Sequence, residues 1–220
     1  MDIKEKIIEQ MWKELLTKSC KTITMDEIAQ NLGISKRTLY ENFTGKEDLL
    51  EQSIHFYINI LDKKIDEDVA NAENSLDIII RIMFRKSEFT KQIDIKQVMD
   101  IQKYYPTVFK KLFNNETKWE EGRAKFKVQI TNAIKEGFIT DSLNVDFILN
   151  FVEMNIHHSM DMEYLENNNF YTQNTINILN ILIPIRGIAT LKGVQFIDNL
   201  TWKARDFSHI DKMKNTKLKN

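Results

Sequence analysis

The chain has few of the residues that turns, disulfides and cysteine-rich metal sites require. Its 220 residues include 6 glycines, 2 prolines and a single cysteine. Hairpins and many-stranded sheets use glycine and proline in their turns, so this scarcity favours an all-helical fold. The lone Cys20 cannot form an intrachain disulfide and excludes a cysteine-rich zinc module, which fits a reducing, cytoplasmic setting.

A strong charge bias and long apolar runs are also missing. The 31 basic and 32 acidic residues nearly cancel, so no overall field marks the chain as a nucleic-acid or membrane-surface protein. The two longest apolar stretches, 78–84 and 176–191, are interrupted by Arg81, Asn180, Pro184 and Arg186. We therefore expect no membrane span, and the charged start of the chain predicts no secretory signal.

Short helices with clear start and stop signals are predicted in the first quarter of the chain. Apolar residues at helical spacing begin at Ile3 and continue to Leu15. Thr24, three residues before Glu27, forms a capping box that starts a second helix, and Gly33 ends it. Ser35 is a good N-cap for a third helix. This arrangement predicts a helix-turn-helix packed on the first helix.

A fourth, longer helix follows directly. Thr44 and Glu47 form a second capping box, and apolar residues recur at helical spacing from Leu49 to Leu61. The third helix has Leu39 and Phe43 as its inward pair, one turn apart. We therefore expect the other residues of the third helix to face outward or lie at the rim.

The segment TMDEIAQNLGISKRTLYENFTGKEDL, from Thr24 to Leu49, resembles the DNA-binding domain of TetR family regulators. The capping threonine, turn glycine, capping serine, Leu-Tyr pair, phenylalanine and lysine stand together at the family's spacing. The resemblance covers about the first fifth of the chain. It implies a homodimer that binds a double-stranded DNA operator, expected to be palindromic, and that places its effector pocket among the middle helices.

The candidate DNA contacts lie on the third helix and beside it. Lysine and arginine can donate to guanine, asparagine can pair with adenine, and threonine offers a methyl group and a hydroxyl. The positive end of the fourth helix dipole disfavours a lysine in the first turn unless a phosphate binds there. The resemblance implies the same role for this lysine and assigns the tyrosine and the capping threonine to the DNA backbone. The candidates are Thr24, Lys36, Arg37, Thr38, Tyr40, Asn42 and Lys46.

Helical patterns continue beyond residue 71, with a break expected before Pro106. The helix beginning after Asn144 has two apolar faces, and the segment 175–191 is apolar nearly all round. A chain of 26.1 kDa cannot easily bury both helices by itself, which predicts a homodimer with Ile178 and Ile181 at or next to the interface.

The candidate effector pocket rests on residue type and on the resemblance. Methionine and aromatic side chains suit an adaptable cavity for a small apolar or amphipathic ligand. The candidates are Met83, Met99, Trp119, Phe126, Phe151 and His158. The group Glu153, His157 and His158 does not predict a metal site, because adjacent helical residues point about 100° apart and no third ligand is visible.

We therefore predict an all-α, two-domain transcriptional regulator. Residues 1–46 form a helix-turn-helix DNA-binding domain, 47–200 form a helical effector-binding and dimerisation domain, and 201–220 form a flexible tail. The function expected is a ligand-released repressor without cofactor, metal or catalytic site. The alternative is a helical ligand-binding or structural protein whose helix-turn-helix is only scaffold.

Overall fold

The computed structural model describes residues 2–90, 95–113, 116–158 and 173–203, and this part of the chain contains eleven helices. They are α1 (Ile3–Leu15), α2 (Met25–Leu32), α3 (Lys36–Asn42), α4 (Lys46–Ala70), α5 (Ser75–Thr90), α6 (Ile95–Tyr104), α7 (Pro106–Phe113), α8 (Glu116–Lys135), α9 (Val145–His158), α11 (Gln173–Ile188) and α12 (Leu191–Lys203). No strand forms among these residues. The predicted all-α fold is confirmed.

The start and stop signals of the helix-turn-helix act as the sequence predicts. The Thr24 hydroxyl accepts a hydrogen bond from the Glu27 amide at 3.1 Å, which caps α2. Gly33 ends α2 at φ 64°, in the left-handed region that glycine enters without steric cost. The Ser35 hydroxyl accepts from the Thr38 amide at 3.0 Å and starts α3. These caps fix the length of the turn between the two helices.

The start of α4 differs from the predicted capping box of Thr44 and Glu47. Gly45 is the N-cap residue and contributes no side-chain hydrogen bond. Asp48 instead accepts from the Thr44 amide at 2.8 Å and from its hydroxyl at 3.1 Å. No capping box forms here, because Gly45 has no side chain that could accept a hydrogen bond. The Asp48 carboxylate instead holds Thr44, the residue before the N-cap.

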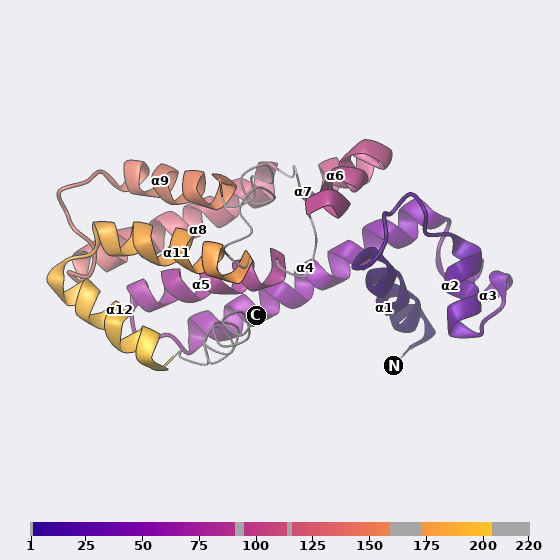
Figure 1. The fold of residues 1–220 in the computed structure, drawn as a ribbon, viewed down its shortest axis with the longest axis horizontal. Helices are drawn as coiled ribbons and strands as arrows, with labels where there is room; N and C mark the ends of the chain where they lie inside the picture. Colours follow the sequence, from indigo (N-terminus) through magenta and orange to yellow (C-terminus); the bar gives the residue numbers. More distant parts are fainter. Residues whose placement is uncertain (1, 91–94, 114–115, 159–172, 204–220) are drawn as a thin grey trace, which may run out of the picture.

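A first core joins the three amino-terminal helices to the start of α4. It is built on side chains that are fully buried, including Ile7, Met11, Leu39 and Leu49. Ile101 of α6 and Val108 of α7 belong to the same core. In Figure 1, α6 and α7 lie beside the first part of α4, toward the helix-turn-helix.

A second core lies at the far end of α4, among α5, α8, α9, α11 and α12 (Figure 1). Leu76, Ile130 and Ile148 are among its fully buried side chains. Helix α4 runs from one core to the other and is the long connection between the two halves. In the described part of the chain, no helix is long and apolar enough to cross a membrane.

Helix α12 was not predicted, and it extends into the segment expected to be a tail. The preceding strand-like contact pairs Ile139 with Ala189 in a single antiparallel bridge. The Thr190 hydroxyl then accepts from the Gly193 amide at 3.2 Å and caps the new helix. Residues 201–203 are therefore helical, and 204–220 lie outside the described residues.

Candidate DNA-binding surface

The inward and outward faces of α3 are arranged as the spacing predicts. Leu39 and Phe43 are buried in the first core. Lys36 and Arg37 are exposed, and Tyr40 keeps 54% of its surface accessible. Thr38 and Asn42 are half-buried at the rim. The short helix therefore presents polar side chains outward on a rigid apolar base, as a helix that enters a DNA groove requires.

The two cations of α3 are each paired with a carboxylate. Lys36 Nζ lies 2.6 Å from Asp26 Oδ2, which joins the start of α3 to the start of α2. Arg37 Nε donates to Glu41 Oε1 at 2.9 Å, one turn further along α3. All four side chains are exposed, so these are weak ion pairs that another acceptor can replace.

The smaller polar candidates are engaged with the local backbone. The hydroxyls of Ser35 and Thr38 lie 2.9 Å apart, and Asn42 Nδ2 donates to the Thr38 carbonyl at 2.8 Å. Thr24 uses its hydroxyl oxygen as the cap of α2 while remaining exposed. Its hydroxyl proton can therefore still donate to a phosphate.

Lys46 occupies the first position of α4, where the sequence predicts a phosphate contact. Its ammonium group donates to the Lys21 carbonyl at 3.1 Å and lies 5.6 Å from the centre of the Tyr105 ring. Among the described residues it has no carboxylate partner. The lysine is thus held by a loop of the first domain and by a side chain at the α6–α7 junction, while its charge stays unneutralised.

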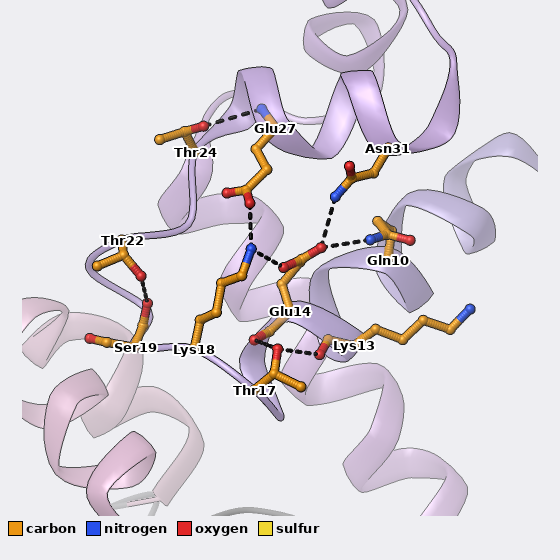
Figure 2. Close-up of polar contacts among 10 residues, drawn as sticks. All are labelled: Gln10, Lys13, Glu14, Thr17, Lys18, Ser19, Thr22, Thr24, Glu27 and Asn31. Atoms are coloured by element: carbon orange, nitrogen blue, oxygen red, sulfur yellow. Dashed lines mark hydrogen bonds and ion pairs between the residues drawn. The ribbon is translucent and has the colours of Figure 1, made fainter.

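A polar network holds α2, and with it the helix-turn-helix, against α1 (Figure 2). Glu14 is buried and accepts hydrogen bonds from Gln10, from Asn31 of α2 and from Lys18, each at 2.8 Å. Lys18 also pairs with Glu27 of α2. The bond from Lys18 lowers the pKa of Glu14 below its ordinary value, against the opposing effect of burial. Glu27 therefore serves this network rather than completing the predicted capping box.

The four predicted pocket residues whose side chains are described have different surroundings. Met83 and Phe126 both pack in the second core, whereas Met99 is 58% exposed on α6. Met99 borders a surface hollow of about 450 Å³ together with Lys96 and Lys103. Phe151 is half-buried and stacks on Phe147 of α9. The side chains of Trp119 and His158 lie outside the described residues.

The structure describes the side chain of one of the two predicted dimer residues. The side chain of Ile178 lies outside the described residues. Ile181 is only 5% exposed and packs in the second core of its own subunit, so it offers a partner almost no surface. Apolar side chains that are more than half exposed in this region include Ile183 of α11, and Phe147 and Met154 of α9. The predicted second apolar face of α9 is therefore present and unburied within the subunit.

Sequence reasoning missed Tyr105 and the packing of α6 and α7 on the first core. The sequence predicts only a helical pattern with a break before Pro106 here, and such a pattern does not say which core Ile101 and Val108 join. Cys20, in the loop after α1, is fully buried near Asp100 of α6 and belongs to the same core. Burial raises the pKa of the Cys20 thiol and disfavours its thiolate.

Within the described residues, no three histidine, cysteine, aspartate or glutamate side chains converge on a point where a metal ion could bind. The side chains of Glu153, His157 and His158 are not among those described.

Comparisons with known proteins agree with this geometry. Residues 7–52 match the family model described as bacterial regulatory proteins, tetR family. The match contains most of α1, all of α2 and α3, and the start of α4, and it confirms the resemblance drawn from the Thr24–Leu49 segment. No curated protein matches the chain.

Solved structures of transcriptional regulators share the fold over most of the chain. A TetR-family regulator from Marinobacter aquaeolei VT8 is 17% identical over 93% of this chain and 100% of its own, with a TM-score of 0.70. A putative regulator from Saccharomonospora viridis in complex with choline is 14% identical over 85% and 97%, with a TM-score of 0.70. The regulator FadR from Bacillus subtilis in complex with stearoyl-CoA is 15% identical over 84% and 98%, with a TM-score of 0.62.

Proposed function

We propose that this chain, built on the helical fold of TetR regulators, is a sequence-specific DNA-binding repressor that acts as a homodimer and is released from its operator by a small apolar or amphipathic ligand. The observation that supports DNA binding is the arrangement of side chains on α3. Its buried Leu39 and Phe43 leave Lys36, Arg37 and Tyr40 facing outward, next to the capped start of α2 and the uncapped start of α4. The proposal includes no catalytic step.

Two classes of contact follow from the positions of the cations. Arg37 and Lys36 stand on the outward face of α3 and are proposed to contact base edges in the major groove. Lys46 is the first residue of α4, beside the free amides of the first turn. The ammonium group and these amides both attract an anion. It is proposed to hold a phosphate, together with Thr24 and Tyr40.

Selection of bound sequences from a random duplex library tests DNA binding directly. We expect one enriched sequence, palindromic because two copies of α3 read two half-sites. Arg37→Ala should weaken binding unevenly across sequence variants, by about 1–3 kcal/mol where a base contact is lost, whereas Lys46→Ala should weaken all sequences alike. A chain that enriches no sequence and shows no salt-dependent binding is instead a helical protein whose helix-turn-helix is scaffold.

The effector class is proposed from the apolar character of the larger domain. The neighbours' ligands, choline and stearoyl-CoA, differ in size and charge, so the shared fold does not select one. Met83 and Phe126 in the second core favour an apolar or amphipathic ligand. Thermal-shift screening with acyl-CoA thioesters, free fatty acids and quaternary amines, followed by DNA titration with each stabilising compound, tests release. Stabilising ligands that all leave the DNA affinity unchanged would exclude this mechanism.

A further inference from the structure

We propose that Asp26 and Glu41 are specificity-determining residues, which act as built-in counterions of Lys36 and Arg37 and withhold these cations from non-cognate DNA. This inference rests on the proposed DNA-binding function and adds a role for two carboxylates within it. It concerns the contrast between DNA of random sequence, bound through phosphates, and the cognate site, bound also through base edges.

The pairing is specific in its geometry. Asp26 lies in the first turn of α2 and reaches Lys36 across the helix-turn-helix turn, at 2.6 Å. Glu41 reaches Arg37 along α3, at 2.9 Å. Within the described residues, each carboxylate and each cation has only this one charged partner. Both cations that face the groove are therefore neutralised in the free protein.

The cation at the phosphate position is treated differently. Lys46 donates to a backbone carbonyl and lies over an aromatic ring, and neither neutralises its charge. Lys21, whose carbonyl accepts the bond from Lys46, has its own ammonium group over the Tyr104 ring. It likewise has no carboxylate partner among the described residues. The charge pattern thus leaves the cations near α4 available to phosphates and screens the two on α3.

This pattern affects the two modes of DNA binding unequally. Binding to random DNA is driven by the release of counterions from phosphates, and a cation already neutralised by a carboxylate contributes little to it. A guanine edge offers lysine or arginine two acceptors at fixed positions, and a freed carboxylate can accept from a cytosine amino group. The exposed pairs are weak enough to open when a cognate sequence offers these contacts.

The test measures binding of the full-length chain to a duplex of random sequence over a series of salt concentrations. Asp26→Asn and Glu41→Gln each remove one counterion and leave the size of the side chain unchanged. We expect each substitution to tighten binding about two- to fivefold and to steepen the dependence of log affinity on log salt by about 0.9. Glu67→Gln, at an exposed carboxylate near the far end of α4 that has no ion pair among the described residues, is the matched control and should leave the slope unchanged.

A double-mutant cycle tests whether the gain in affinity for random DNA comes from releasing Arg37 from Glu41. Arg37→Ala should cost more affinity for random DNA in the Glu41→Gln background than in the wild-type chain, because only there is Arg37 free. Circular dichroism and melting temperatures verify that the variants are folded. Unchanged slopes, or equal effects from Glu67→Gln, overturn the inference while DNA binding stands. A wild-type chain that binds no DNA overturns the proposed function itself, and the inference with it.

Discussion

Position 193 requires glycine because the backbone of another segment lies too close for a side chain, and not because of its own torsion angles. A Cβ atom at this position would lie 2.1 Å from the Phe138 carbonyl oxygen, far inside contact distance. The approach is close because the segment after α11 pairs with the segment after α8. Thr140 donates to the Ile188 carbonyl at 2.9 Å, and Thr190 donates to the Phe138 carbonyl at 3.0 Å. One small residue thus allows α12 to start against the end of α8.

We expect Gly193→Ala to lower the free energy of unfolding by about 1–3 kcal/mol, because the carbonyl and the helix start must move apart. Gly187→Ala is the matched control. Its Cβ meets nothing within 4 Å in helix α11, so this alanine should stabilise the chain by about 0.5–1 kcal/mol. Urea denaturation of both variants measures the two effects. Equal changes would contradict a role for the close contact.

Glu14 gives the helix-turn-helix a predictable dependence on pH. Its pKa is depressed in the folded chain, first by the bond from Lys18 and then by the bond from Gln10, although burial opposes them. A carboxyl with a depressed pKa contributes stability above its ordinary titration range and loses it as the pH falls through the folded pKa.

Glu14→Gln should lower stability near neutral pH by about 1–3 kcal/mol, because the charge-assisted bonds are lost. The difference between variant and wild type should shrink as the pH falls through the depressed pKa of Glu14, below the ordinary range of a glutamate. Thermal melts between neutral and acidic pH measure it. A stability difference that stays constant with pH would show that Glu14 acts by packing alone.

At the scale of helices, the sequence predicts those helix starts and ends that depend on neighbouring residues. The caps at Thr24, Ser35 and Asn144, the end at Gly33 and the break before Pro106 all depend on a few neighbouring residues, and all are found as predicted. Phe43 and Leu39 were placed inside by their spacing alone. The helix-turn-helix is therefore almost fully predictable from sequence.

Contacts between segments that are far apart in the chain cannot be predicted in this way. Helix α12 starts where Thr190 bonds to the Gly137 carbonyl, 53 residues away in the chain. The assignment of α6 and α7 to the first core, and of Ile181 to the interior of its own subunit, depends on which faces meet in space. Periodicity identifies an apolar face but not the element that covers it.

Helix α9 is the element on which the proposed dimer can be tested. Ile148 and Val152 pack inward, while Phe147 is 57% and Met154 51% exposed on the other face. Phe147→Glu should leave the subunit folded, since the side chain is outside the core, and should convert a dimer to a monomer by burying a charge in the interface. Sedimentation velocity measures the mass. Ile181→Glu would instead disturb the subunit's own core.

Met99→Glu is the control for the dimer test, because Met99 is equally exposed but lies on α6, away from α9. It should sediment as the wild-type chain does. A Phe147→Glu variant that is folded and still dimeric would exclude this face of α9 as the interface.

At the scale of the molecule, α4 is fastened at both ends to the larger set of helices. Near its start, Glu51 pairs with Lys111 of α7 at 2.8 Å, and near its end, Asp68 pairs with Arg85 of α5 at 2.7 Å. The first core extends onto α6 and α7, so a displacement of these helices reaches the helix-turn-helix without passing through the length of α4 (Figure 1). The ring of Tyr105, at their junction, lies below Lys46 Nζ, with 5.6 Å between that nitrogen and the ring centre.

We therefore expect Tyr105 to influence DNA affinity through Lys46. Tyr105→Leu keeps an apolar side chain in the first core but removes the ring face that attracts the ammonium group, whereas Tyr105→Phe keeps the ring. The leucine variant should weaken binding to all DNA sequences by the same factor, about two- to fivefold, because the lysine is less well ordered for a phosphate. The phenylalanine variant should bind as the wild-type chain does.

The Lys46→Ala background decides whether Tyr105 works through the lysine. If it does, Tyr105→Leu has no further effect on DNA affinity once Lys46 is removed, and the coupling energy of the cycle equals the loss measured in the wild-type chain. If Tyr105 only supports the fold, the same loss recurs in both backgrounds and the melting temperature falls with it. A ligand that shifts α6 and α7 would, in the first case, change DNA affinity by moving a single contact, since a tenfold change requires only about 1.4 kcal/mol of preference between two states.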